Sequence, residues 1–171
     1  MNDLYQMLMA TTEQWAMLEA PALPERFILR NGRCFTGRKL PAGFKKGKIK
    51  QCFQNSTLLL DTRAGRHLRY VEGFFMRGDL CFPIMHAWCI DEDDQVVDVT
   101  LDRPEECQYV GFVMSRNELW DEITKTECYG VLDTGFGLNH KFMFARDPEL
   151  EEIVRGVAKN IQFRDVERAM Q

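Results

Sequence analysis

The stretch that decides the fold is PIMHAWCIDEDDQVVDVTL, residues 83–101. Its two ends, 83–90 and 95–101, are rich in β-branched and aromatic residues, which is typical of strands. The acidic residues between them favour a turn. The runs LRYVEGFFM at 68–76 and QYVGFVMS at 108–115 have a similar composition. The middle of the chain therefore predicts an antiparallel sheet.

Helical patterns lie before and after these strands. Residues 3–19 carry apolar side chains spaced to fall on one face of an α-helix. A second helix is predicted from Cys52 to about Ala64. Ser115 and Glu118 form a capping-box pattern, which opens a third helix. The order of helices, strands and helices predicts an α+β fold.

The rest of the chain extends this core on both sides. We expect a single domain, residues 1–171, with its core at about 50–115. Residues 1–49 are predicted to hold the first helix, a hairpin that turns at Asn31-Gly32, and a basic loop. Residues 116–171 are predicted to hold the C-terminal helices and a Gly-rich loop. The finer boundaries are hairpin strands at 27–30 and 33–36, a loop at 130–139, and a last helix opened by Asp147 and Pro148.

Composition excludes several classes of protein. With 45% hydrophobic and 28% charged residues, the chain is not disordered, collagen-like or a coiled coil. The net charge of −4 argues against a nucleic-acid partner. No apolar run approaches the ~20 residues that span a bilayer, so no membrane association is expected. The N-terminus lacks the pattern of a secretory signal, which predicts a cytoplasmic protein.

The cysteine spacing points away from metal binding and disulfides. No pair is separated by two residues, as in zinc or redox motifs. Cys81, His86 and Cys89 lack a fourth metal ligand. We therefore expect no metal, no cofactor, and reduced thiols. The six cysteines are at 34, 52, 81, 89, 107 and 128.

Three residues together suggest chemistry. Cys52 lies at the predicted start of a helix, where free N–H groups and the helix dipole favour a nucleophilic thiolate. His86 and Asp98 lie on consecutive strands. If the turn is centred on Glu92 they are directly opposed, and if it is centred on Asp93 they are diagonal neighbours on one face. Either arrangement permits a hydrogen bond, by which the carboxylate would orient the imidazole of a catalytic triad.

These residues also carry a family resemblance. The motif His-Ala-Trp at 86–88, followed by Asp-Val-Thr at 98–100, resembles the transglutaminase-like cysteine enzymes. Cys52 precedes the histidine by 34 residues (86 − 52), where the nucleophile of that family would fall. With Cys-Phe-Gln-Asn at 52–55 and Tyr-Val-Glu-Gly at 70–73, the chain also resembles small uncharacterised phage and bacterial proteins.

The resemblance implies a papain-like α+β core, in which the helix bearing the cysteine packs on an antiparallel sheet that carries His86 and Asp98. It covers about residues 50–115. Two departures concern the site. Gln51 and a phenylalanine flank the cysteine where the family often has small residues, and Val99 replaces the usual proline between aspartate and threonine.

Four further side chains are candidates for supporting roles. Gln51 or Gln54 could donate a hydrogen bond to an oxyanion, since acyl transfer needs donors aimed at the developing charge. Glu72, in an otherwise apolar strand, is either buried near the site or on an exposed face. Trp88 is either a wall of the substrate cleft or part of the core.

Two functions are consistent with these residues. The first is a cysteine-dependent hydrolase or acyltransferase that acts on an amide or thioester, of the protease, deamidase or transglutaminase type, with a protein or peptide substrate. The second is a non-catalytic protein-binding effector on the same scaffold, for example one encoded by a phage.

Overall fold

The computed structural model describes residues 3–18, 22–80, 82–135 and 137–156. Its helices are α1 (Asp3–Met17), α2 (Leu23–Asn31), α3 (Cys52–Leu60), α4 (Arg116–Thr126) and α5 (His140–Arg146), with a 3-10 turn η1 (Pro104–Glu106) and a further helical stretch at 148–156. Its strands are β1 (Arg33–Thr36), β2 (Arg69–Arg77), β3 (Ile84–Ile90), β4 (Val96–Val97) and β5 (Cys107–Met114). The expected α+β class is confirmed. No helix of this part is long and apolar enough to cross a membrane.

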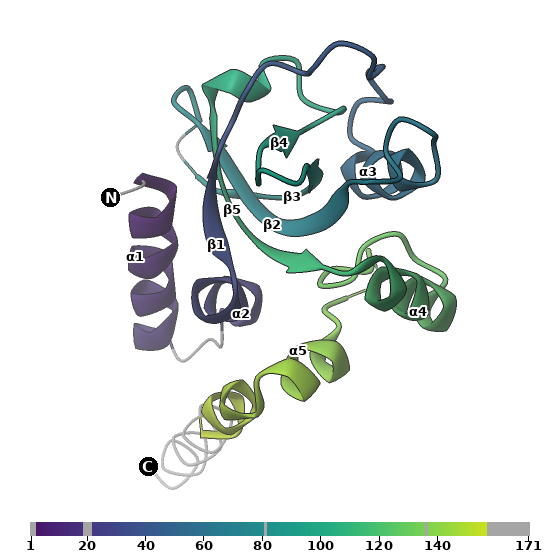
Figure 1. Ribbon diagram of the computed structural model, residues 1–171. Helices are drawn as coiled ribbons and strands as arrows, with labels where there is room; N and C mark the ends of the chain where they lie inside the picture. Colours follow the sequence, from purple (N-terminus) through teal and green to yellow (C-terminus); the bar gives the residue numbers. More distant parts are fainter. Residues whose placement is uncertain (1–2, 19–21, 81, 136, 157–171) are drawn as a thin grey trace, which may run out of the picture.

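The strands form one curled antiparallel sheet in the order β1-β5-β2-β3-β4 (Figure 1). Side chains alternate between its two faces, as the pleat requires. One face carries Tyr70, Ala87 and Val110 and packs against residues from the helices. The other carries Trp88 and Tyr109 and forms a second, smaller apolar cluster inside the curl. The sheet is therefore buried on both faces.

The helix α3 is fixed to the sheet by specific hydrogen bonds. Ser56 Oγ donates to the carbonyl of Ala87 over 3.0 Å, and Cys89 Sγ donates to the carbonyl of Ser56 over 3.4 Å. Leu59 and Leu60 of the same helix are buried in the larger cluster. These contacts hold the start of α3 in a defined position relative to β3.

The predicted hairpin at Asn31-Gly32 is wrong. Residues Leu23–Asn31 form α2, because Leu23, Phe27 and Ile28 line one helical face and are buried, and Pro24 suits the first turn of a helix. Burial of that face outweighs the local turn signal. A Cβ at Gly32 would lie 2.6 Å from the carbonyl oxygen of Ile28, so glycine permits the close approach that follows α2.

Two other boundaries differ from the prediction. The strand expected at 95–101 is limited to Val96–Val97, because the Asp98 side chain bonds the following backbone and ends the ladder. The short helix α5 was not predicted. The capping box at Ser115 and Glu118 is present and opens α4 as expected.

Candidate active site

Cys52 is the first residue of α3, as predicted. The preceding Gln51 provides no side-chain cap, and the first backbone bond of the helix is from Asn55 N–H to the Gln51 carbonyl, at 2.8 Å. The N–H groups of the first turn of a helix have no partner within the helix. Here they belong to the half-buried Cys52 and the residues next to it, where they can stabilise a thiolate or an oxyanion.

His86 and Asp98 form the predicted hydrogen bond. His86 Nε2 lies 2.7 Å from Asp98 Oδ2, and the two residues are only 3% and 1% exposed. The register pairs Cys89 with Val97, which centres the turn on Asp93. The two side chains are therefore diagonal neighbours, the second of the two arrangements considered, and Asp98 directly follows β4.

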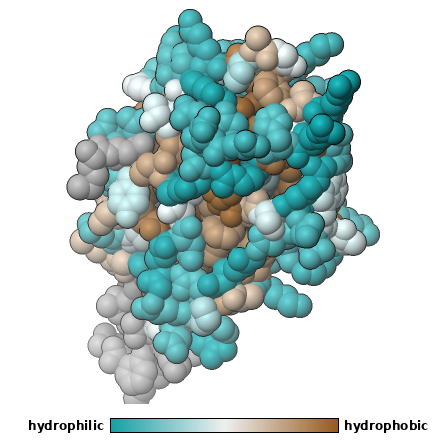
Figure 2. All heavy atoms as spheres, in the orientation of Figure 1, coloured by the Kyte–Doolittle hydropathy of each residue, from teal (hydrophilic) through white to brown (hydrophobic). Residues whose placement is uncertain are grey.

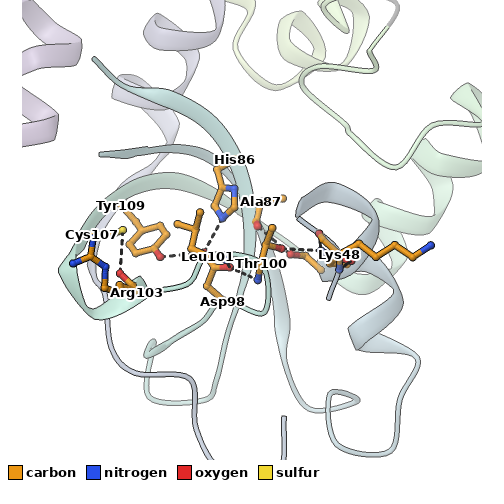
Figure 3. A network of polar contacts seen from close by, with 11 residues as sticks. Lys48, His86, Ala87, Asp98, Thr100, Leu101, Arg103, Cys107 and Tyr109 are labelled. Atoms are coloured by element: carbon orange, nitrogen blue, oxygen red, sulfur yellow. Dashed lines mark hydrogen bonds and ion pairs between the residues drawn. The ribbon is translucent and has the colours of Figure 1, made fainter. Parts of the chain in front are cut away.

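Four donors surround the Asp98 carboxylate (Figure 3). Oδ1 accepts from the backbone N–H groups of Thr100 at 2.8 Å and Leu101 at 3.1 Å. Oδ2 accepts from the Tyr109 hydroxyl at 3.0 Å as well as from His86. Burial would raise the pKa of Asp98, but His86 and the backbone donors overcome it, and the pKa is lowered. The carboxylate is thus held ionised and in one orientation.

His86 connects this carboxylate to Cys52. Burial would lower the pKa of His86, but the Asp98 charge and hydrogen bond, together with a hydrogen bond to Cys52, raise the pKa to about 9. Because Nε2 faces Asp98, Nδ1 is the nitrogen available to Cys52. With this pKa the ring holds a proton at neutral pH, and the ionised Asp98 keeps it oriented beside Cys52.

The other described thiols have different surroundings. Burial raises the pKa of Cys34, of Cys89 and, to about 11, of Cys107. None of them is placed against an imidazole as Cys52 is. Cys81 lies outside the described residues. Among the cysteines that are described, all with free thiols, Cys52 has the environment that best favours a nucleophile.

Gln51 and Gln54 lie beside Cys52 on the rim of a pocket of about 240 Å³. Their side chains make no hydrogen bond to any described residue, so both amides are free to meet a ligand. The opposite rim is the Gly-rich segment that includes Gly130 and Asp133, and Phe53 of α3 forms part of the wall. The pocket is thus lined by the residues on either side of Cys52 in the sequence, and Cys52 itself is not part of its lining.

Trp88 belongs to the core. It is fully buried inside the curl, its ring centroid lies 4.9 Å from that of Tyr109, and it stacks near His86 at 6.2 Å. A Cβ at Gly111 would lie 2.5 Å from the indole, so glycine makes room for the ring. Trp88 therefore supports the His86 side chain and does not wall an open cleft.

Glu72 is buried on the opposite face of the sheet. Its carboxylate accepts the backbone N–H groups of Val131 at 2.8 Å, Leu132 at 2.7 Å and Asp133 at 3.2 Å, and the Tyr70 hydroxyl at 3.1 Å. Burial raises the pKa of Glu72 to about 7, although these donors oppose the shift. Glu72 thus holds the loop that forms one rim of the pocket.

Replacing Glu72 by glutamine is expected to loosen this loop. An amide cannot accept from all three N–H groups, and a buried donor without a partner costs about 1–3 kcal/mol. We expect a loss of that size in the free energy of urea unfolding. Hydrogen exchange at Val131, Leu132 and Asp133 should also become faster. Unchanged exchange at these amides would contradict the anchoring role.

Two residues that organise the site were not predicted. Tyr109 reaches Asp98 from β5, and Asn55 links α3 to Lys48 and to Thr100, with Asn55 Nδ2 lying 2.7 Å from the Lys48 carbonyl and 3.0 Å from Thr100 Oγ1. Asn55 follows Cys52 by one helical turn, a spacing that places both on one helix face.

No group of three or more His, Cys, Asp or Glu side chains within the described ranges could hold a metal ion. Comparisons with protein-family models, with curated proteins and with solved structures found no match. The feature of the described residues that points to a function is the geometry of Cys52, His86 and Asp98.

Proposed function

We propose that the protein is a cysteine-dependent hydrolase or acyltransferase of the transglutaminase-like class, acting on an amide or thioester. The observation that carries the proposal is the position of His86, between Cys52 at the uncapped start of α3 and the fully hydrogen-bonded carboxylate of Asp98. A nucleophile, a proton carrier and an orienting group in this order are the parts that acyl transfer requires.

The proposed reaction has two steps. The proton of Cys52 passes to His86, and the sulfur attacks the acyl carbon while the N–H groups at the start of α3 stabilise the oxyanion. The imidazolium gives its proton to the leaving amine or thiol as the bond to it breaks. Water or an amine then attacks the thioester, with His86 taking its proton, and Cys52 is released as the thiol.

An activated ester tests this proposal without knowledge of the natural substrate. With p-nitrophenyl acetate we expect a burst of p-nitrophenolate and the mass of one acetyl group on Cys52. Cys52→Ala should give no burst. Cys128→Ala, which removes another half-buried thiol, is the matched control and should keep it. If acetylation spreads equally over the cysteines, the protein-binding effector becomes the better interpretation.

A further inference from the structure

A run of cations in the sequence ends two residues before the candidate nucleophile. Residues 38–50 hold six lysines and arginines and no acidic residue, in a chain whose net charge is −4. Two of the six are paired: Arg38 with Asp91 at 2.6 Å, and Lys46 with Asp102 at 2.9 Å. The other four are exposed and form no ion pair with any described residue. They are Lys39, Lys45, Lys48 and Lys50.

The end of this segment is fixed against the site. Gly47 N–H donates to the Val99 carbonyl at 2.7 Å, next to Asp98, and the backbone of Lys48 makes two hydrogen bonds with the Asn55 side chain. In Figure 3 the Lys48 side chain extends away from the buried network. The positions of Lys48 and Lys50 relative to Cys52 are therefore set by the fold.

The same segment presents an apolar side chain. Ile49, between the two lysines, is 73% exposed. Lys50 has a φ of 64°, a conformation that an L-residue seldom adopts. Hydrophilic residues cover much of the face shown in Figure 2, with apolar residues between them. Of the large apolar side chains exposed in the described residues, Ile49 is the one with a lysine on each side in the sequence. This arrangement fits a partner that combines carboxylates with an apolar side chain.

We propose that the acyl group attacked by Cys52 is presented by an acidic polypeptide segment. Its carboxylates would contact Lys45, Lys48 and Lys50, and an apolar side chain would contact Ile49. This inference rests on the proposed function, which requires an acyl carbon. A polypeptide supplies both acyl carbons and apolar side chains, whereas a nucleic acid strand supplies only the negative charge.

The local positive charge can attract an acidic segment although the net charge of the protein is −4. At physiological ionic strength charges are screened over about 8 Å, so the nearby lysines act on a bound segment more than the net charge of the whole protein does. A positively charged cleft raises the association rate of an anionic ligand by about tenfold or more, and salt removes this gain.

Binding to full-length Cys52→Ala protein tests the surface without turnover. The probe is a short fluorescein-labelled peptide in which glutamates flank a leucine and a glutamine. We expect measurable binding that weakens with salt and no binding of the same peptide with lysines in place of glutamates. Tighter binding of a single-stranded oligonucleotide of equal charge would overturn the choice of a polypeptide.

Charge-reversal variants test which lysines bind the acidic peptide. With Lys48→Glu and Lys50→Glu combined, binding of the acidic peptide should weaken by about tenfold or more. Lys141→Glu, an exposed lysine of α5 without an ion pair to described residues, is the matched control and should change binding less than about twofold. Equal losses in the two proteins would refute the proposed surface.

Alkylation of the wild-type thiol separates this inference from the proposed function. The rate of Cys52 labelling by neutral iodoacetamide reports the reactivity of the thiol. Iodoacetate is negatively charged and iodoacetamide is neutral, so the ratio of their labelling rates reports the electrostatic potential at Cys52. This ratio should fall severalfold in the Lys48→Glu, Lys50→Glu protein and stay unchanged in Lys141→Glu. If Cys52 is unreactive but the acidic peptide still binds, the proposed enzymatic function is refuted and the proposed peptide-binding surface is retained.

Discussion

Limiting iodoacetamide at about pH 6.5 is expected to label Cys52 about tenfold or more faster than any other described cysteine. This pH lies well below the ordinary thiol pKa of about 8.5, so an unassisted thiol is almost entirely protonated. Cys52 alone has both the free N–H groups of a helix start and a protonated imidazole beside it. Peptide mapping by mass spectrometry after timed quenching gives the rate for each thiol.

Variants of His86 and Asp98 show whether His86 causes the faster labelling of Cys52. His86→Ala should abolish the preference for Cys52. Because His86 is buried and alanine leaves a cavity, His86→Gln serves as a second variant that fills the space without accepting a proton. Asp98→Asn should reduce the preference less, since Asp98 acts on Cys52 only through the orientation and charge of the ring. An unchanged labelling rate in both His86 variants would mean that no thiolate–imidazolium pair exists in the free protein.

The parts of the site that could be predicted are those determined by local sequence. His86 and Asp98 are separated by a single turn, so counting residues from that turn limited their relation to two arrangements, of which the second is observed. The start of α3 at Cys52 follows from the change between a polar loop and an apolar run. Both inferences involve neighbours along the chain, for which spacing fixes geometry.

The parts that could not be predicted depend on contacts between distant segments. Tyr109 reaches Asp98 because the sheet curls, although β2 and β3 lie between β5 and β4, and no local pattern specifies this arrangement. Glu72 is matched to N–H groups about sixty positions away in the chain. The helix α2 was missed for the same reason, because burial of Phe27 against the ring of Phe112 outweighs the turn preference of Asn31-Gly32.

The stability of the protein should fall as the pH rises from about 6.5 to about 9, and Asp98→Asn should remove much of this fall. His86 has its pKa raised from 6.5 to about 9, chiefly by Asp98 against the opposing effect of burial. A raised pKa means that the folded state binds a proton which the unfolded state has already released. The stabilisation is therefore complete below pH 6.5 and is lost as the pH passes through 9.

At acidic pH, protonation of the Asp98 carboxylate removes the stabilisation that the His86–Asp98 pair provides. The pKa of Asp98 is lowered, so its contribution is present above its ordinary value and is lost as the pH falls below it. The pair should stabilise the fold most at mildly acidic pH. One pKa unit corresponds to about 1.4 kcal/mol, which makes the loss on the alkaline side on the order of 3 kcal/mol.

Urea unfolding at constant ionic strength between about pH 6 and pH 9.5 measures this loss. Other groups titrate in the same range. Cys107 also reduces stability at alkaline pH, because burial and, to a smaller extent, the Asp98 charge raise its pKa. The Asp98→Asn profile is therefore compared with that of His86→Gln, which keeps the Asp98 charge, and the fall that both variants lose belongs to the His86 pair. Asparagine can keep the bonds from the Thr100 and Leu101 N–H groups through its Oδ1, so the variant is expected to fold. Parallel pH profiles for wild type and Asp98→Asn would show that His86 is not held as an imidazolium by Asp98, and the proposed function would then lack the imidazolium that it places beside Cys52.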